Sequence, residues 1–531
     1  MSQKRISCWR AAKRIVIMAL VLLALPFPIR GWSQSPSFRL DEATIAGVHA
    51  AYQSGQLTSR QLVQMYLDRI EAYDRKGPSI NSIQVVNPEA LEEADKLDAA
   101  FKRSGLVGPL HGIPVILKDM IDSQGMATTF GSVMFKDFYP EKDAFVVEKL
   151  KRAGAIILGK ATVAEFVGGD NYGSLFGTTL NPYALDRTPG GSSGGTGASV
   201  AANFVTIGVG QENAASTRRP SAWNAVVGMR TTAGLISRTG SYGGWPSIIG
   251  SLTPMTRTVT DLAKLLDVMV GYDSEDPVTA LGVGKVPGSY TEFLDPNGLR
   301  GARIGVIREP LANNARLAPE DYKSVNDVFE HALEELKRAG AELVDPLVIP
   351  RLRELMAKRV RGPEEDASFN VYFARHPNAP YKSRKEIIEA PEFAQVFPET
   401  QQRLRGTYDV PPEQYYEYLF ARQELMIIIS KVMADQKLDA LLYKSIDGPP
   451  PLIQKGPIPS SAPGAGFPTL NTFLVFVPAI SVPAGFTRDN LPVGITFQGR
   501  PYADGLMIKL AYAYEQATRH RKPPRLSADM R

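Results

Sequence analysis

Two stretches of the sequence combine dense glycine with small hydroxyl residues. The first is Thr188–Gly197, TPGGSSGGTG, and the second is Gly210–Pro220, GQENAASTRRP. Such glycine density is typical of backbone that turns sharply or approaches a ligand closely, and it leaves amide N–H groups available to an anion. The alternative is an ordinary loop of glycine and serine with no functional role. A Walker nucleotide loop is disfavoured, because the G-x-x-x-x-G-K-[ST] pattern is absent.

The segment Gly191–Gly195 also fits the G-x-S-x-G pattern of a nucleophile elbow, with Ser193 as the nucleophile. That interpretation needs a strand running into the serine, whereas Arg187–Gly190 has a turn sequence. It also needs a downstream histidine base, and two of the three candidates lack a local acid-base setting, since His331 lies in an amphipathic helix and His520 beside a basic tail. These candidates are His331, His376 and His520.

A lysine offers a different base. Lys118 ends the apolar, strand-compatible run of Gly112–Asp119, GIPVILKD, where an ammonium group would be costly to bury. Desolvation lowers a lysine pKa, and a neutral amine can then accept a proton from a hydroxyl group. A surface lysine at the end of a strand is the alternative.

Taken together, these blocks resemble the amidase signature family of serine hydrolases, which use a Ser–cis-Ser–Lys arrangement. The resemblance covers about residues 40–518, and several independent blocks occur in the order typical of the family. The matching blocks are Gly112–Asp122, Gly190–Gly195, Ser216–Arg218 with Pro220, and Pro478–Phe486 through Gly499–Pro501.

The resemblance implies a role for each of three side chains. Ser216 would be the nucleophile, Ser192 the bridging serine on a cis peptide, and Lys118 the base that acts through Ser192. A serine hydroxyl is a weak nucleophile until a positioned base accepts its proton, and the tetrahedral oxyanion needs preorganised donors. The resemblance places those donors on the backbone N–H groups of Asn213, Ala214, Ala215 and Ser216. Residues expected to support the loops or the substrate are Gly190, Gly191, Ser193, Glu212 and Arg218.

One block departs from the family pattern. Members commonly have Asp-x-Gly-Gly before the nucleophile, whereas this chain has Glu212-Asn213-Ala214-Ala215. If either glycine position requires a positive φ, alanine there costs on the order of 1–2 kcal/mol and tilts the donors. We expect a slightly remodelled oxyanion hole that still works. A catalytically poor member retained for binding is the alternative.

Other site features are less specific. Four aromatic side chains lie in or near the matched blocks and could line an acyl pocket, although aromatic residues more often belong to a core. Five scattered histidines and no H-E-x-x-H motif give no support for a metal site, and no cofactor is expected. The four aromatic residues are Phe130, Tyr172, Phe176 and Trp223.

The elements that must position these residues alternate between helix and strand, which indicates an α/β sheet covered by helices. The family resemblance implies, more specifically, a mixed central β-sheet sandwiched by α-helices. A capping box begins a helix at Thr58, and Ala144–Ala153 is expected to be a helix followed by a strand at Ala155–Leu158. The unit recurs with a helix at Ser324–Ala339 and a strand at Glu342–Val344. We interpret residues 278–451 as an elaboration packed over the sheet, where substrate is selected.

The N-terminus has the pattern of a secretory signal peptide. A basic lead precedes the apolar run Ile15–Leu25, which is too short to cross a bilayer as a helix. We therefore expect a signal peptide at 1–34, a single domain at 35–531, and a periplasmic or secreted protein; an uncleaved membrane anchor is the alternative. The one cysteine, Cys8, lies within this segment.

The net charge of the chain indicates which kinds of partner it is suited to bind. The formal net charge is +5, but six basic residues and no acid lie in the first 34 residues, so the remainder carries −1. That balance argues against nucleic acid as a partner. We predict an amidase that cleaves a small or medium carboxamide, an N-acyl amine or a related ester through an acyl-enzyme, with a homodimer possible and no stable membrane insertion after signal removal. The alternatives are an exported non-catalytic binding protein and a glutamine-dependent amidotransferase subunit.

Overall fold

The computed structural model describes residues 38–309, 311, 317–360, 362–406, 410–454, 460–461 and 470–527. The predicted signal peptide at 1–34 lies outside these residues. The described residues from Arg39 onward form one compact unit. No helix in the described ranges combines the length and apolar character needed to cross a membrane.

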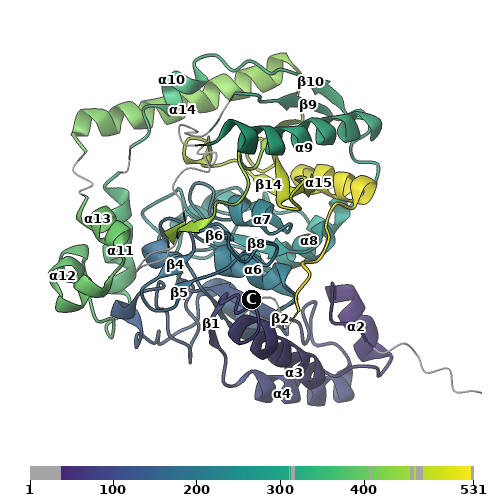
Figure 1. The fold of residues 1–531 in the computed structure, drawn as a ribbon, viewed down its shortest axis with the longest axis vertical. Helices are drawn as coiled ribbons and strands as arrows, with labels where there is room; N and C mark the ends of the chain where they lie inside the picture. Colours follow the sequence, from purple (N-terminus) through teal and green to yellow (C-terminus); the bar gives the residue numbers. More distant parts are fainter. Residues whose placement is uncertain are drawn as a thin grey trace, which may run out of the picture. The chain divides into compact units, whose positions relative to one another are not determined.

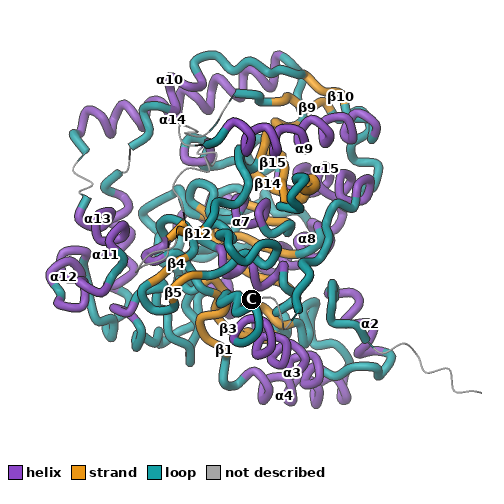
Figure 2. The backbone as a smooth tube through the Cα atoms, viewed as in Figure 1, coloured by secondary structure: helices purple, strands orange, loops and turns teal. Residues whose placement is uncertain are grey.

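A large mixed sheet is the centre of the unit, as the sequence predicts. Figure 2 shows its strands as a band that runs from β10 at one edge to β1 at the other. Within the described residues its order is β1 (Ile83–Val86), β3 (Ile156–Ala161), β2 (Pro114–Lys118), β6 (Ile207–Glu212), β8 (Ser251–Thr256), β7 (Val227–Arg230), β14 (Ala479–Phe486), β15 (Pro492–Gln498), β11 (Ala440–Lys444), β9 (Arg303–Val306) and β10 (Glu342–Val344). Two short hairpins accompany it, β4 (Tyr172–Gly173) with β5 (Gly177–Thr178) and β12 (Ile453–Gln454) with β13 (Ser460–Ser461).

Pairing is parallel in the two places where helices connect neighbouring strands. Strand β2 runs parallel to both β3 and β6, and β9 runs parallel to both β10 and β11. The strands between these two regions, from β8 to β15, pair antiparallel. The end of β2 therefore lies between β3 and β6 with its side chains buried.

Helices cover the sheet. On one face, α6 (Gly194–Ala201) and α7 (Arg218–Trp223) approach so closely that a Cβ on Gly208 or Gly228 would collide with their side chains. In a second group, α8 contacts both α5 and α15, and the three helices contact β8, β3 and β14 respectively. The bounds are α2 (Ile45–Gln53), α3 (Ser59–Arg69), α4 (Ala90–Ser104), α5 (Phe145–Arg152), α8 (Val259–Met269), α9 (Pro319–Arg338), α10 (Leu352–Met356), α11 (Glu364–Ala374), α12 (Arg384–Glu389), α13 (Pro398–Arg405), α14 (Pro412–Asp435) and α15 (Asp504–Thr518).

Several predicted elements are confirmed. Thr58 begins α3 with a complete capping box, α5 falls within the predicted 144–153 helix, and β10 has the predicted bounds. The predicted helix at 324–339 begins earlier, at Pro319, because proline is well suited to the first helical turn.

The range 278–451 is only partly an elaboration over the sheet. Its segments β9, β10 and β11 extend the sheet beyond β15, and α14 packs there through Tyr418 and Leu425. Three further helices of this range, α11, α12 and α13, lie together at one side of the unit (Figure 1). Strand β10 was predicted, whereas β9 and β11 were missed because they are four and five residues long and lie among helical, charged sequence.

Candidate active site

Lys118 is the last residue of β2, and its side chain is fully buried. Its Nζ lies 2.7 Å from Ser192 Oγ, 3.1 Å from the carbonyl oxygen of Gln211 and 3.2 Å from Gln211 Oε1. Gln211 belongs to β6, the strand next to β2, so the sheet pairing brings it to the amine. The predicted contact between positions 118 and 192 is therefore present.

Burial controls the protonation of this amine. Desolvation lowers the pKa of Lys118 well below its ordinary value of 10.5, and the charge of Glu212 opposes that shift without cancelling it. A lowered pKa increases the neutral fraction near neutral pH, and only the neutral amine can accept a proton. The site thus places an amine of lowered pKa 2.7 Å from a hydroxyl group.

Ser192 follows a cis peptide bond with Gly191 and lies just before α6. Gly190 has φ +82°, and a Cβ at Gly191 would come within 2.4 Å of a backbone oxygen, so both positions favour glycine. The neighbouring Ser193 is buried, its backbone N–H donates to the Ser216 carbonyl, and its Oγ bonds to the Gln211 carbonyl at 3.1 Å. Ser193 thus connects two loops and does not face substrate as an elbow nucleophile would.

Ser216 lies beyond the end of β6, half-buried on the wall of the main pocket. None of the described residues accepts a hydrogen bond from the backbone N–H of Ala214, Ala215 or Ser216. These residues and Asn213 line the pocket. Free amides at this edge can receive an anionic oxygen.

The alanines cause no backbone strain. Neither Ala214 nor Ala215 is among the described residues with positive φ. The left-handed conformation that would penalise alanine is therefore not needed here. Substituting alanine for the family's glycines leaves the amides in place.

Glu212 and Arg218 form a fully buried ion pair at 2.8 Å beneath this loop. The carboxylate also accepts the backbone N–H groups of Thr217 and Arg218 at 3.0 Å each. Arg218 continues to the Tyr443 hydroxyl at 2.8 Å and to the Ala214 carbonyl. The pair therefore fixes the turn that carries Ser216.

The pocket has a volume of about 580 Å³. Trp223 and Tyr172 line it, as the sequence analysis allowed, whereas Phe130 and Phe176 are not among its lining residues. Phe130 is instead buried among other rings, including Phe135 at 5.1 Å between centroids. The range 278–451 contributes the lining residues Arg359, Val360, Gly362, Glu365, Glu399, Arg403, Tyr418 and Pro451.

Charged side chains also line the pocket. Arg219 pairs with Asp170 at 2.8 Å and donates to the Gly191 carbonyl at 2.9 Å, so it ties the pocket wall to the cis peptide. Arg403 of α13 donates to the Glu165 carbonyl at 2.7 Å. The pocket lining therefore includes both signs of charge, from Asp170, Arg219 and Arg403.

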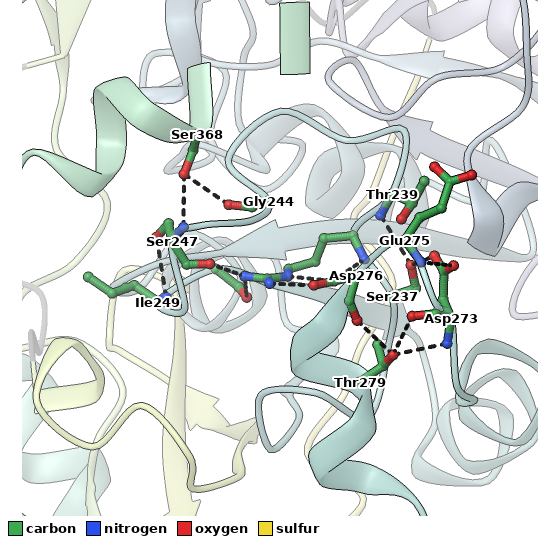
Figure 3. Close-up of polar contacts among 12 residues, drawn as sticks. Ser237, Thr239, Gly244, Ser247, Ile249, Asp273, Glu275, Asp276, Thr279 and Ser368 are labelled. Carbon is green, nitrogen blue, oxygen red and sulfur yellow. Dashed lines mark hydrogen bonds and ion pairs between the residues drawn. The ribbon is translucent and has the colours of Figure 1, made fainter. Parts of the chain in front are cut away.

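Four residues of the 241–250 segment line the pocket, namely Tyr242, Gly243, Ser247 and Ile249. Figure 3 shows the contacts that hold this segment at Ser247. Arg238 donates from Nε and Nη2 to Asp276 at 2.8 Å each and from Nη1 to the Ser247 carbonyl. Ser368 of α11 accepts the Ser247 N–H at 3.0 Å. The segment is thus held at Ser247 by Arg238 on one side and by Ser368 of α11 on the other.

A second fastening joins α11 to the strand end near Lys118. His376 Nε2 lies 2.9 Å from Asp122 Oδ2, and the Tyr372 hydroxyl donates to Asp122 Oδ1 at 2.7 Å. Burial opposes a charge on His376, but the hydrogen bond and charge of Asp122 outweigh it and raise the pKa of His376 above 6.5. The elbow candidates His331 and His520 both pair with Glu335 instead.

The pH dependence of this fastening can be measured. Replacing His376 with glutamine should lower the free energy of unfolding by about 1.5 kcal/mol in acid, where the imidazolium pairs with Asp122. Because the folded-state pKa is raised, the difference is complete below pH 6.5 and disappears as pH rises through the folded value. Denaturant titration from about pH 5.5 to 9 measures it. His331→Gln, at an exposed pair, should change stability little; equal losses at all pH values would contradict the prediction.

Several residues of the site were not predicted from the sequence. The sequence analysis assigned no role to Gln211, which it included only within the Gly210–Pro220 block, and none to Arg219 or Asp170. Strand pairing and loop packing bring them together, and no local pattern encodes that. In the part of the chain that the structure describes, no group of three or more His, Cys, Asp or Glu side chains is placed to hold a metal ion.

The fold and the buried lysine and serine pair define an amide hydrolase, and comparison with known proteins identifies its family. The sequence profile named Amidase matches residues 61–508. A protein of Arabidopsis thaliana named a probable amidase is 31% identical over 541 residues, covering 96% of this chain and 98% of its own length. The chain belongs to the amidase signature family, and it hydrolyses amide C–N bonds.

Solved structures agree with this assignment. A peptide amidase in complex with the competitive inhibitor chymostatin has a TM-score of 0.79 and 34% identity, covering 92% of this chain and all of that chain. The native peptide amidase of Stenotrophomonas maltophilia has a TM-score of 0.77 and 33% identity, covering 91% and 99%. Among curated relatives, a glutamyl-tRNA(Gln) amidotransferase subunit from Moorella thermoacetica is 35% identical, covering 89% and 96%.

Proposed function

We propose that the chain cleaves its amide through a covalent acyl-enzyme on Ser216. Neutral Lys118 accepts the proton of Ser192, which accepts that of Ser216 as its Oγ adds to the amide carbon. The oxyanion is received by the amides of residues 213–216. The proton returns through Ser192 to the leaving amine, the C–N bond breaks, and water then releases the acid. The observation that carries this proposal is the 2.7 Å contact between Lys118 Nζ and Ser192 Oγ.

The proposed substrate is a peptide-like carboxamide. A pocket of about 580 Å³ accommodates more than a small aliphatic amide, and Trp223, Tyr172 and Ile249 offer apolar contact. Similarity to two peptide amidase structures supports this substrate class. A panel of peptide, aryl and aliphatic amides with matched leaving groups tests it; preference for short aliphatic amides would contradict it.

The acyl-enzyme can be intercepted. Added hydroxylamine should divert the acyl group to a hydroxamate, because it competes with water for the same intermediate. The ratio of hydroxamate to acid should be equal for an amide and an ester of one acid, since both form the same acyl-enzyme. Mass spectrometry of the products measures the ratio, and unequal ratios would exclude a shared intermediate.

We also propose export to the periplasm or the medium. The support is the basic and apolar pattern of the first 34 residues. Mass spectrometry of the chain purified from the producing cell tests this proposal, because signal cleavage would remove roughly the first 34 residues. A full-length chain in the membrane fraction would instead indicate an uncleaved anchor.

Membership of an amidotransferase complex is the second candidate function. The relatives named as glutamyl-tRNA(Gln) amidotransferase subunits favour it, since they match along most of their length. The near-neutral charge beyond residue 34 favours a small substrate over tRNA. Glutamine hydrolysis that depends on co-purified subunits would support this candidate, and efficient hydrolysis by the isolated chain would argue against it.

A further inference from the structure

Two buried arginines donate hydrogen bonds to backbone carbonyls of residues 213–216, the oxyanion segment, whose N–H groups are proposed to receive the oxyanion. Arg230, the last residue of β7, donates from Nη1 to the Asn213 carbonyl at 3.3 Å, and Arg218 donates from Nη2 to the Ala214 carbonyl. In a trans peptide the N–H points away from the carbonyl of the preceding residue. The bond to residue 213 therefore sets the direction of the Ala214 N–H, and the bond to residue 214 sets that of Ala215.

The two arginines differ in their charge balance. Arg218 is paired with Glu212, whereas Arg230 makes no ion pair within the described ranges. Arg230 instead donates to the carbonyls of Asn471 and Ile249 at 2.7 Å each, and to that of Val475 at 3.3 Å. One side chain thus joins the oxyanion segment to the 247–250 and 470–475 loops, and both loops line the pocket.

A buried cation at this point also has an electronic effect. Burial lowers the pKa of Arg230 to about 10, so the side chain stays protonated at neutral pH. A charged donor on a carbonyl polarises the whole peptide group, and its N–H becomes a stronger donor. The effect is larger in a site of low dielectric than in water.

We propose that Arg230 is a positioning residue for transition-state stabilisation, holding and polarising the 213–214 peptide so that the Ala214 N–H points at the developing oxyanion. The inference rests on the proposed acyl-enzyme mechanism. Arg230 does not touch the substrate, because the pocket-lining residues include Asn213, Ile249 and Thr472 but not Arg230 itself. Its contribution arises in the transition state, when the carbonyl oxygen gains charge.

Replacing Arg230 with methionine removes the charge and all four bonds, and Arg230→Lys keeps the charge with a shorter reach. We expect kcat to fall about 100-fold in the first and about 10-fold in the second, with KM changed by less than about threefold. An aldehyde analogue of the acyl group should lose affinity in parallel with kcat/KM, because its serine adduct carries the oxyanion. The product carboxylate should bind all variants equally.

Arg257 provides a matched control. It is also buried, donates to the Val200 and Val205 carbonyls at 3.1 and 2.7 Å, and, like Arg230, has an Nε with no hydrogen-bond partner among the described residues. Arg257→Met should lower the melting temperature yet keep kcat and aldehyde affinity, whereas Arg230→Met should lose both.

Equal kcat in the two arginine variants, after correction for folded fraction, would overturn the inference. If Arg230→Met does not fold, the lysine variant decides the question. An active Ser216→Ala enzyme would instead refute the proposed mechanism, so the two failures are distinguishable.

Discussion

Replacing Ser216 with alanine is expected to lower kcat/KM for amide hydrolysis by on the order of 10⁵-fold, which is the size of effect that removing a nucleophile has in serine hydrolases. The half-buried Ser216 hydroxyl is the one placed on the pocket wall beside free backbone amides. Substrate affinity should remain, since the pocket walls do not depend on this oxygen. Steady-state kinetics with a peptide amide measures the first quantity, and calorimetric titration into the variant measures the second.

Ser221→Ala is the matched control for this experiment. Ser221 lies five positions further along, in α7, and its buried Oγ has no hydrogen-bond partner in the part of the chain that is described. Its removal should leave both kinetics and labelling by a fluorophosphonate probe near those of the native enzyme. A Ser216→Ala variant that still hydrolysed amides and took up the label would mean that another hydroxyl is the nucleophile. A native chain that bound amides without turnover would favour the non-catalytic binding protein.

The sequence predicted three strands of the sheet, the ones now labelled β2, β3 and β10, because the signals for these strands are local. A lysine after an apolar run indicates a buried strand end, and a capping box at Thr58 fixes a helix start in four residues. Strands β9 and β11 were not predicted, because parallel pairing between distant segments leaves no periodic pattern in four or five residues. Their place at the sheet edge depends on α14 packing behind them.

The same distinction applies to the site. Lys118 and Ser192 could be found because each lies in a block with an unusual composition, and the structure places them in contact. Gln211 and Arg230 carry no such signal, since a glutamine or arginine in a strand usually faces solvent. Only the sheet order β2-β6-β8-β7 turns them toward the amine and the oxyanion segment. Glu365 of α11 and Arg403 of α13 line the pocket, and the bonds that join the α13 region to Glu165 connect residues more than 200 positions apart in the sequence.

Replacing Lys118 with methionine or arginine is expected to lower kcat by about 10⁴-fold, the upper range for loss of a general base. Methionine cannot accept a proton, and arginine keeps the positive charge but does not deprotonate in proteins. Equal loss in both variants therefore separates a base from a fixed charge. If Lys118→Arg kept substantial activity, the amine would act only through its charge.

The native enzyme should gain activity as pH rises, with a limb whose apparent pKa lies well below that of an ordinary lysine, because burial lowers the pKa of Lys118.

The lowered pKa of Lys118 also affects the free energy of unfolding. The unfolded chain binds a proton that the folded chain binds weakly, so native stability rises with pH between the folded pKa and 10.5. Lys118→Met lacks this dependence, so its free energy of unfolding, relative to that of the native enzyme, should be most favourable in acid and least favourable near pH 10.5. Parallel stability profiles for the two proteins, or a flat rate profile with chemistry rate-limiting, would show that Lys118 is not the neutral base.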